Sequence, residues 1–202
     1  MISFFEHIGW GLAVIALAGT AYTILAALLV GRFMQNPQGP AHHSPAVTIL
    51  KPLHQGEPDL SRNLETFFAQ DYDGALQIIF GVHDQHDPAI AVVRALQAKY
   101  PHRDTAIVID AALYGANAKV SNLINMLPTA RHDTLVLSDS DIAVGRKWLS
   151  QVTAALARPG VGIVTCLYTG EPAKDGHRLW SSLAAMSTSY TFLPNAVLGR
   201  NV

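Results

Sequence analysis

Short apolar runs alternate with helical patterns over most of this 202-residue chain. The runs typical of strands lie at residues 47–50, 76–82, 105–109, 133–138 and 161–168. Apolar residues recur at helical spacing over residues 59–70, 87–100, 117–126 and 146–157. A strand–helix unit repeated four times and closed by a strand predicts an α/β fold, in which a mainly parallel, Rossmann-like sheet carries helices on both faces. Ligands of such sheets bind beyond the carboxyl ends of the strands.

The fourth run ends abruptly in the sequence Asp139-Ser140-Asp141. The stretch begins as a short apolar run with β-forming residues, which is typical of a strand buried on both faces. If the strand ends at Ser138, the turn can bring both carboxylates together, and hard oxygen ligands suit Mg²⁺ or Mn²⁺. The alternative is that the two aspartates cap the next helix or fill a turn, because so short a motif also occurs by chance.

Polar side chains follow the other strands as well. Those at or after the ends of the first three strands are His54, Glu57, His83, Asp84, Asp87, Asn117 and Lys119. Because parallel strands end at one edge of a sheet, this convergence favours the ligand interpretation of Asp139 and Asp141. A His/Asp metal cluster within residues 83–87 is the weaker alternative, because Asp87 before Pro88 is a natural helix cap. The sequence lacks the glycine motifs of dinucleotide, P-loop and α/β-hydrolase sites.

Residues 8–31 contain no charged side chain, and most are Ala, Leu, Ile, Val or Gly. As a helix, a stretch of this length spans a hydrocarbon core of about 30 Å. A signal peptide and a buried soluble helix are the alternatives, but Glu6 and His7 stand where a signal peptide has basic residues. We therefore expect a retained transmembrane helix. Tyr22 lies in the middle of this stretch, and we expect it to have a helix partner.

The chain is expected to divide into an anchor at residues 1–32, a linker at 33–46 and one domain at 47–202. Arg32 and Lys51 follow the apolar stretch, so the positive-inside rule predicts that the domain lies in the cytoplasm.

Charge and cysteine content narrow the function classes. The formal net charge is -1 and the pI about 6.7, so nothing indicates a nucleic-acid partner. The single cysteine, Cys166, excludes an internal disulfide, and its apolar setting predicts a small core residue in the fifth strand.

The segment 179–199 is again uncharged but contains many Ser, Thr and Asn residues. That polarity argues against a second membrane span and favours an amphipathic helix at the membrane surface. The residues then expected near lipid are Leu183, Met186, Tyr190 and Phe192. Ordinary core packing is the alternative.

Four motifs in this order resemble those of a known family: Lys51-Pro52, Gly81-Val82-His83-Asp84, Asn117-Ala118-Lys119-Val120-Ser121-Asn122-Leu123 and Asp139-Ser140-Asp141-Ile142. From Val47 to Val202 the chain is similar to inverting, GT-A-type glycosyltransferases of the ceramide glucosyltransferase family, whose bacterial relatives glycosylate hopanoid lipids. The resemblance implies transfer of glucose or N-acetylglucosamine from a UDP-sugar to a ceramide- or hopanoid-like hydroxyl, with inversion, at a bacterial inner membrane.

The resemblance also implies roles for individual residues. Asp84 is expected to meet the uracil or ribose of the donor, and Asp139 and Asp141 to hold Mg²⁺ or Mn²⁺ at its diphosphate. The donor-binding set is Asp84, Asn117, Lys119, Asn122 and Asp139. A lysine in the first turn of a helix opposes the helix dipole and needs an anion, which a donor phosphate would supply.

The chain departs from the family pattern after residue 170. The family continues with a third aspartate, the expected general base, and a Gln/Arg-x-x-Arg-Trp signature. Nothing in residues 170–202 reads as that signature, and Asp175, between Lys174 and Gly176, looks like a turn residue. We expect a donor-binding portion without the base. The alternatives are a non-catalytic, truncated transferase that binds a nucleotide-sugar or a partner, and an unrelated nucleotidyl transferase.

Overall fold

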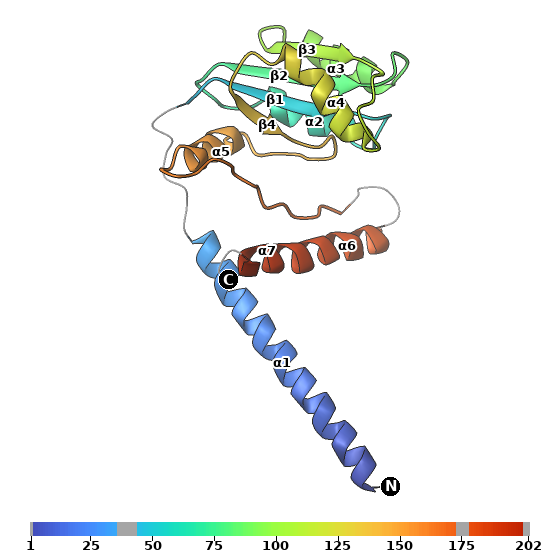
Figure 1. Ribbon diagram of the computed structural model, residues 1–202, viewed down its shortest axis with the longest axis vertical. Coiled ribbons are helices and arrows are strands. Elements are labelled where there is room, and N and C mark those ends of the chain that lie inside the picture. Colours follow the sequence, from blue (N-terminus) through green and yellow to red (C-terminus); the bar gives the residue numbers. More distant parts are fainter. Residues whose placement is uncertain (1, 36–43, 173–177, 200–202) are drawn as a thin grey trace. The chain divides into compact units, whose positions relative to one another are not determined.

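The computed structural model describes residues 2–35, 44–172 and 178–199. The chain forms two compact units, one built from Met1–Pro37 with Thr165–Val202 and the other from Gln38–Val164 (Figure 1). We describe each unit separately. The sequence had placed residues 165–202 with the α/β domain, whereas the contacts group them with the N-terminal helix.

The larger unit is a four-stranded parallel sheet with strand order β3-β2-β1-β4. Its strands are β1 (Val47–Pro52), β2 (Leu76–Val82), β3 (Asp104–Ile109) and β4 (Thr134–Leu137). Its helices are α2 (Leu60–Phe68), α3 (Ala89–Lys99), α4 (Ala118–Met126), the short 3₁₀ helix η1 (Leu127–Thr129) and α5 (Trp148–Leu156). The predicted parallel α/β architecture is therefore confirmed.

Helices cover both faces of the sheet, because successive strand residues point to opposite sides. Ile49, Ile78 and Phe80 point to one face and pack against apolar residues of α2, α3 and α5. Leu50 and Ile79 point to the other face and meet Met126 of α4, the helix in front of the sheet in Figure 1. All residues of β1 and β2 are buried, which fixes these two strands as the centre of the core.

Two predictions about the last strands are wrong. β4 is an edge strand whose Leu135 and Leu137 are 45% and 52% exposed, so it is not buried on both faces. Residues 161–172 form no strand, and Cys166 is exposed rather than in the core. Strand preference depends on a neighbouring strand to pair with, and the apolar run at 161–168 pairs with no strand in the described structure.

The smaller unit consists of helices. In chain order, the helices of this unit are α1 (Ile2–Met34), α6 (Arg178–Ser187), the π-helix η2 (Thr188–Phe192) and α7 (Leu193–Gly199). By length and composition, the segment Phe4–Met34 of α1 is apolar enough to cross a membrane. α7 packs against α1, and the Tyr22 hydroxyl donates to Asn195 Oδ1 at 2.8 Å. The predicted helix partner of Tyr22 is therefore confirmed.

Gly81, on β2, gives a test of the packing between the sheet and α4. A Cβ atom there would lie 2.1 Å from Asn122 Oδ1 and 2.6 Å from Met126 Sδ. We expect Gly81→Ala to lower the free energy of unfolding by about 1–3 kcal/mol, measured by urea denaturation of the detergent-solubilised chain. Gly162→Ala, whose Cβ would meet nothing within 4 Å, is the matched control and should change it by less than about 0.5 kcal/mol. Equal stability of the two variants would contradict this packing.

Candidate functional site at the carboxyl ends of the strands

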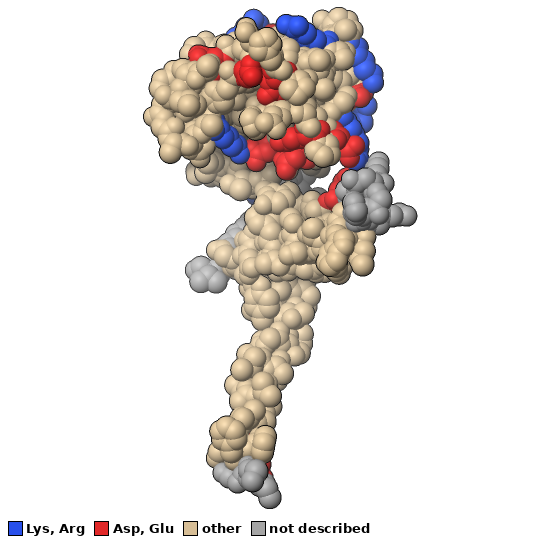
Figure 2. Space-filling model, turned by 90° about the vertical axis from the view of Figure 1, so that its right-hand side faces the viewer, with Lys and Arg blue, Asp and Glu red and all other residues tan. Residues whose placement is uncertain are grey.

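Acidic side chains gather on one edge of the larger unit. Figure 2 views the molecule from the side at which the strands end and shows Asp and Glu side chains clustered there beside Lys and Arg. Asp139 and Asp141 follow β4, and both side chains are exposed. The turn between them is fixed to α2, because Asn63 Nδ2 donates to the Asp141 carbonyl at 3.3 Å.

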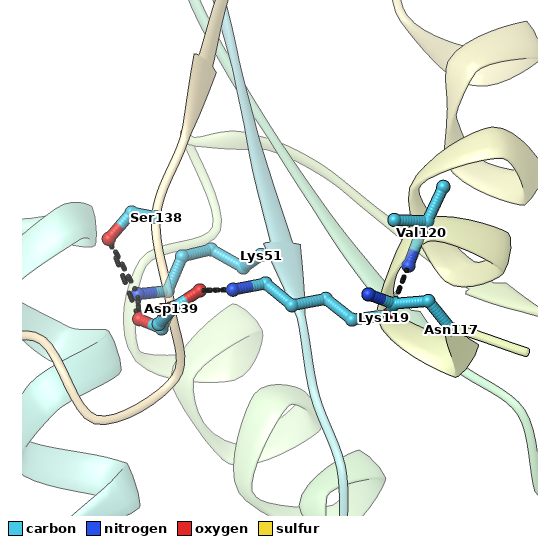
Figure 3. Close-up of polar contacts among 6 residues, drawn as sticks. All are labelled: Lys51, Asn117, Lys119, Val120, Ser138 and Asp139. Carbon is cyan, nitrogen blue, oxygen red and sulfur yellow. Dashed lines mark hydrogen bonds and ion pairs between the residues drawn. The ribbon is translucent and has the colours of Figure 1, made fainter. Parts of the chain in front are cut away.

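Asp139 lies between two lysines (Figure 3). The Lys119 ammonium, from α4, forms an ion pair with the Asp139 carboxylate. The Lys51 ammonium, from β1, donates to the Asp139 backbone carbonyl and to Ser138 Oγ, the latter at 3.3 Å. Lys51 therefore fixes the backbone at the end of β4, and Lys119 contacts the side chain that the same turn presents.

Lys51 is a buried cation. Its side chain is fully enclosed, and its Nζ lies 3.8 Å from the centroid of the Phe67 ring, in cation–π geometry. Burial lowers the pKa of Lys51 to about 7, although the charges of Asp139, Asp141 and Glu57 act in the opposite direction. Burial thus opposes a positive charge on Lys51, and the nearby carboxylates of the turn favour it.

The first turn of α4 carries the other predicted donor-binding residues. Asn117 is the N-cap, and its Oδ1 accepts from the Val120 amide at 3.2 Å. Lys119 follows in the first turn, and the anion that this position requires is the Asp139 carboxylate. Asn122 is buried and donates to the Gly81 carbonyl at 2.8 Å, so its amide ties α4 to β2. Contact of these residues with a donor stays a prediction.

His83, at the end of β2, joins two segments that are distant in sequence. Its Nδ1 lies 2.9 Å from the Asp110 carbonyl, after β3, and its Nε2 lies 2.9 Å from the Ala118 carbonyl, in α4. Carbonyl oxygens only accept, so both hydrogen bonds form together when both ring nitrogens carry a hydrogen. The ring thereby clamps the ends of the segment that leads to Asn117 and Lys119.

Asp84 and Asp87 occupy the turn before α3. Asp84 is exposed, and its Oδ1 accepts from the His86 amide at 2.8 Å, an arrangement that shapes the turn. The buried Asp87 accepts from the Ala89 amide at 2.9 Å and from the Gln55 amide at 2.8 Å. Asp87 thus holds the first amide of α3 from the position before the N-cap residue, Pro88, and among the described residues 83–87 form no metal-binding group.

The residues at the rim fit a cation that takes few ligands from the protein. Among the described residues, no group of three or more His, Cys, Asp or Glu side chains could hold a metal ion. Mg²⁺ and Mn²⁺ sites often use one or two carboxylates and complete their shell with water and phosphate oxygens. Asp139 and Asp141 are exposed carboxylates of that kind, with the Asp139 carboxylate paired to Lys119.

The positioning roles of Lys51 and His83 were not assigned from the sequence. For Lys51, a signal was available: a lysine follows four strand residues and precedes a proline, so its side chain lies within the strand rather than in a loop. For His83, no local signal exists, since its partners are 27 and 35 residues away.

Comparison with known proteins gives a family match over most of the chain. A family model described as Glycosyl transferase family 21 matches residues 11–202. Ceramide glucosyltransferase 1 of Caenorhabditis elegans is 35% identical over 98 residues, covering 48% of this chain and 21% of that protein. Ceramide glucosyltransferase of Candida albicans is 36% identical over 107 residues, covering 48% and 20%. The chain thus spans about a fifth of the length of these curated relatives.

One solved structure is also similar. The mannosyltransferase PcManGT from Pyrobaculum calidifontis, in complex with GDP-Man and Mn²⁺, aligns with a TM-score of 0.48 and 24% identity. The alignment covers 72% of this chain and 44% of that chain.

The buried position of Lys51 predicts a pH dependence of stability. Below pH 7 both states bind the proton, and the full cost of burying the ammonium opposes folding. Between pH 7 and 10.5 the unfolded chain binds more protons than the folded chain, so Lys51 makes stability rise by up to about 1.4 kcal/mol per pH unit. Lys51→Met should remove this slope, as measured by urea denaturation from pH 7 to 10. Parallel curves for the two proteins would contradict the shift.

The exposed Lys99 supplies the control. Its pKa is raised by the hydrogen bond to Glu65, so its contribution is present below pH 10.5 and falls only above it. Lys99→Met should therefore leave the slope between pH 7 and 10 unchanged.

The clamp formed by His83 predicts local protection. We expect His83→Ala to speed amide hydrogen exchange over residues 110–121 roughly five- to thirtyfold, from about 1 kcal/mol for each of the one or two hydrogen bonds lost. His86→Ala is the matched control, because the His86 ring is exposed and its hydrogen bond is to the neighbouring Gln85 side chain. Unchanged exchange in His83→Ala would show that the ring does not hold this segment.

Proposed function

This chain belongs to glycosyl transferase family 21, and on that premise we propose that it binds a UDP-sugar at the carboxyl ends of β1, β2 and β4. The domain division proposed with this is a membrane anchor at residues 1–32, a linker and a donor-binding, GT-A-type domain. The whole enzyme transfers the sugar to a lipid hydroxyl. The single observation that carries the proposal is Asp139, exposed at the end of β4 with Lys119 at its carboxylate and Lys51 at its carbonyl.

The residues at this edge match the charge of a nucleotide diphosphate. Lys119 is half exposed and stands in the first turn of α4, where backbone amides also attract anions. In the proposed complex, the Lys119 ammonium moves from Asp139 to a phosphate oxygen, and Asp139 and Asp141 become ligands of Mg²⁺ or Mn²⁺. The cation, when bound, supplies positive charge that stabilises the departing UDP.

The nucleoside end of the donor is assigned to Asp84. Its carboxylate can accept from the uracil imide or a ribose hydroxyl through the oxygen that does not bind the His86 amide. Asn117 holds the start of α4 in place for the diphosphate, and Asn122 holds the helix against β2. These two asparagines are proposed to position the donor site by fixing the backbone.

The reaction proposed for the whole enzyme is a single displacement. The acceptor oxygen attacks the anomeric carbon of glucose or N-acetylglucosamine as the bond to the phosphate oxygen breaks on the opposite face, which inverts the configuration. The acceptor is a ceramide- or hopanoid-like lipid, and its hydroxyl proton passes to a general base. We assign that base to no residue of this chain. The domain is proposed to face the cytoplasm of a bacterial inner membrane, where nucleotide-sugars are made.

Metal-dependent binding of UDP tests the donor site. Isothermal titration of the detergent-solubilised chain should show UDP affinity at least about tenfold higher with Mn²⁺ than with EDTA, a difference of about 1.4 kcal/mol. Asp139→Asn should remove this metal effect. Asp104→Asn is the control, since Asp104 is another carboxylate in an ion pair, with Arg131 at 2.8 Å. Equal affinity with Mn²⁺ and EDTA would refute the proposed site.

A binding-only function is the second candidate, and the partial coverage of the relatives favours testing it directly. In that case the chain binds the donor but transfers no sugar. Incubation with a radiolabelled UDP-sugar and a lipid extract separates the two, because only a transferase makes a radiolabelled lipid.

A further inference from the structure

The loop between β3 and α4 is held in place at several points, although residues 110–117 form no helix or strand. Its start is fixed by Asn125 of α4, whose Nδ2 donates to two loop carbonyls, each at 3.1 Å. Further along, the Tyr114 amide donates to Ser121 Oγ at 3.0 Å. Asn125 and Ser121 are both buried, so the loop backbone is anchored to the packed side of the helix.

This fixed loop exposes two large side chains. Leu113 and Tyr114 are 63% and 62% exposed, and the Tyr114 hydroxyl has no hydrogen-bond partner among the described residues. A single exposed apolar side chain is common and by itself indicates nothing. A tyrosine on a fixed backbone, however, presents a large, rigid face at a low cost in conformational entropy, as binding sites often do. The position of this ring on the molecule therefore decides its interpretation.

One end of the loop adjoins the proposed diphosphate site. Ser121, which binds the Tyr114 amide, follows Lys119 by two residues in α4. Asn117, the N-cap of that helix, comes three residues after Tyr114. The Tyr114 backbone therefore lies against the first turns of α4, where Lys119 and the helix amides are proposed to meet the phosphates.

The other end of the loop adjoins the proposed nucleoside site. β3 pairs with β2 up to the last residue of each strand, so the segments that follow the two strands start side by side. Asp84 comes two residues after β2, and the loop begins directly after β3. The ring of His83, next to Asp84, lies 2.9 Å from the Asp110 carbonyl at the start of the loop. Tyr114 thus belongs to the segment that joins the Asp84 side of the rim to the Lys119 side.

The part of the donor that lies between these two ends is the nucleoside. A nucleobase has a polar edge, which a carboxylate can bind, and two flat faces that are largely apolar. An aromatic side chain covers such a face by stacking, and it does so for every base because every base has a π-face. Tyr114 supplies a ring of this kind beside the carboxylate of Asp84.

We propose that the Tyr114 ring stacks on the uracil of the donor, as a further binding residue of the nucleoside part of the site. The inference rests on the proposed function, because it requires a UDP-sugar at this rim. Asp84 then accepts from the polar edge or the ribose, whereas Tyr114 covers the face of the base and contributes affinity.

Isothermal titration with two ligands tests the stacking contact. UDP and pyrophosphate, each with Mn²⁺, share the diphosphate, but only UDP carries a base. We expect Tyr114→Ala to weaken UDP binding by the detergent-solubilised chain roughly tenfold, since the stacking of one base contributes on this scale. Pyrophosphate binding should change less than about twofold. Tyr114→Phe, which keeps the ring, should bind UDP within about twofold of the wild-type affinity.

Tyr190→Ala is the matched control, because Tyr190 is 73% exposed but belongs to the smaller unit. It should leave both affinities unchanged. Unchanged UDP affinity in Tyr114→Ala would overturn the proposal. Equal weakening of UDP and pyrophosphate would also overturn it, because the side chain would then act through the position of α4 and not through the base.

The absorbance of the bound base gives a second readout. Stacking on an aromatic ring lowers the ultraviolet absorbance of a base. At saturating UDP, we expect this loss with the wild-type chain and with Tyr114→Phe, and its absence with Tyr114→Ala. The same loss in Tyr114→Ala would overturn the contact.

The two proposals fail in different ways. Absence of any UDP binding by the wild-type chain would refute the donor site and, with it, this role of Tyr114. UDP binding that depends on Asp139 but is unaffected by Tyr114→Ala would refute only the stacking contact.

Discussion

The buried ammonium of Lys51 is the interaction on which the candidate site depends. It joins the centre of the sheet, where β1 lies, to the turn at the end of β4, through the Asp139 carbonyl and Ser138. β4 is a short edge strand of four residues, paired on one side only, so its end has few other restraints. A cation beneath the turn both holds the backbone and attracts the two carboxylates that the turn exposes.

The same charge lowers the stability of the folded chain. An ammonium that loses its water must recover the free energy through carbonyls, an aromatic ring and nearby carboxylates, and here all three are present. Replacement of Lys51 by an apolar side chain would remove the desolvation cost, but the turn after β4 would lose its hydrogen bonds to the ammonium. We interpret Lys51 as a residue that positions the turn after β4, at a site where an apolar side chain would give higher stability.

Much of the fold could be predicted from the sequence, because the spacing of apolar residues differs between strands and helices and reveals their alternation. The four strands and four helices of the larger unit lie where the apolar pattern put them, within a few residues. Exposure of β4 and the absence of a strand at 161–168 did not follow, because both depend on strand order, which periodicity does not encode. At the site, the meeting of Lys119 with Asp139 was implied by the shared edge, whereas the clamp by His83 joins carbonyls that no pattern marks.

The hydrogen bond between Tyr22 and Asn195 has a consequence for how the chain is made. Thr20 and Thr23, on the same helix, donate to the Ala16 and Gly19 carbonyls within their own turn and are satisfied as soon as α1 forms. Tyr22 has to wait for a residue synthesised 173 positions later, a delay of roughly 10 to 35 s at ordinary translation rates. During that interval its hydroxyl must stay hydrated, pair with another helix or remain with the insertion machinery. The contact between α1 and α7 is thus completed only when Asn195 has been synthesised and α7 returns to α1.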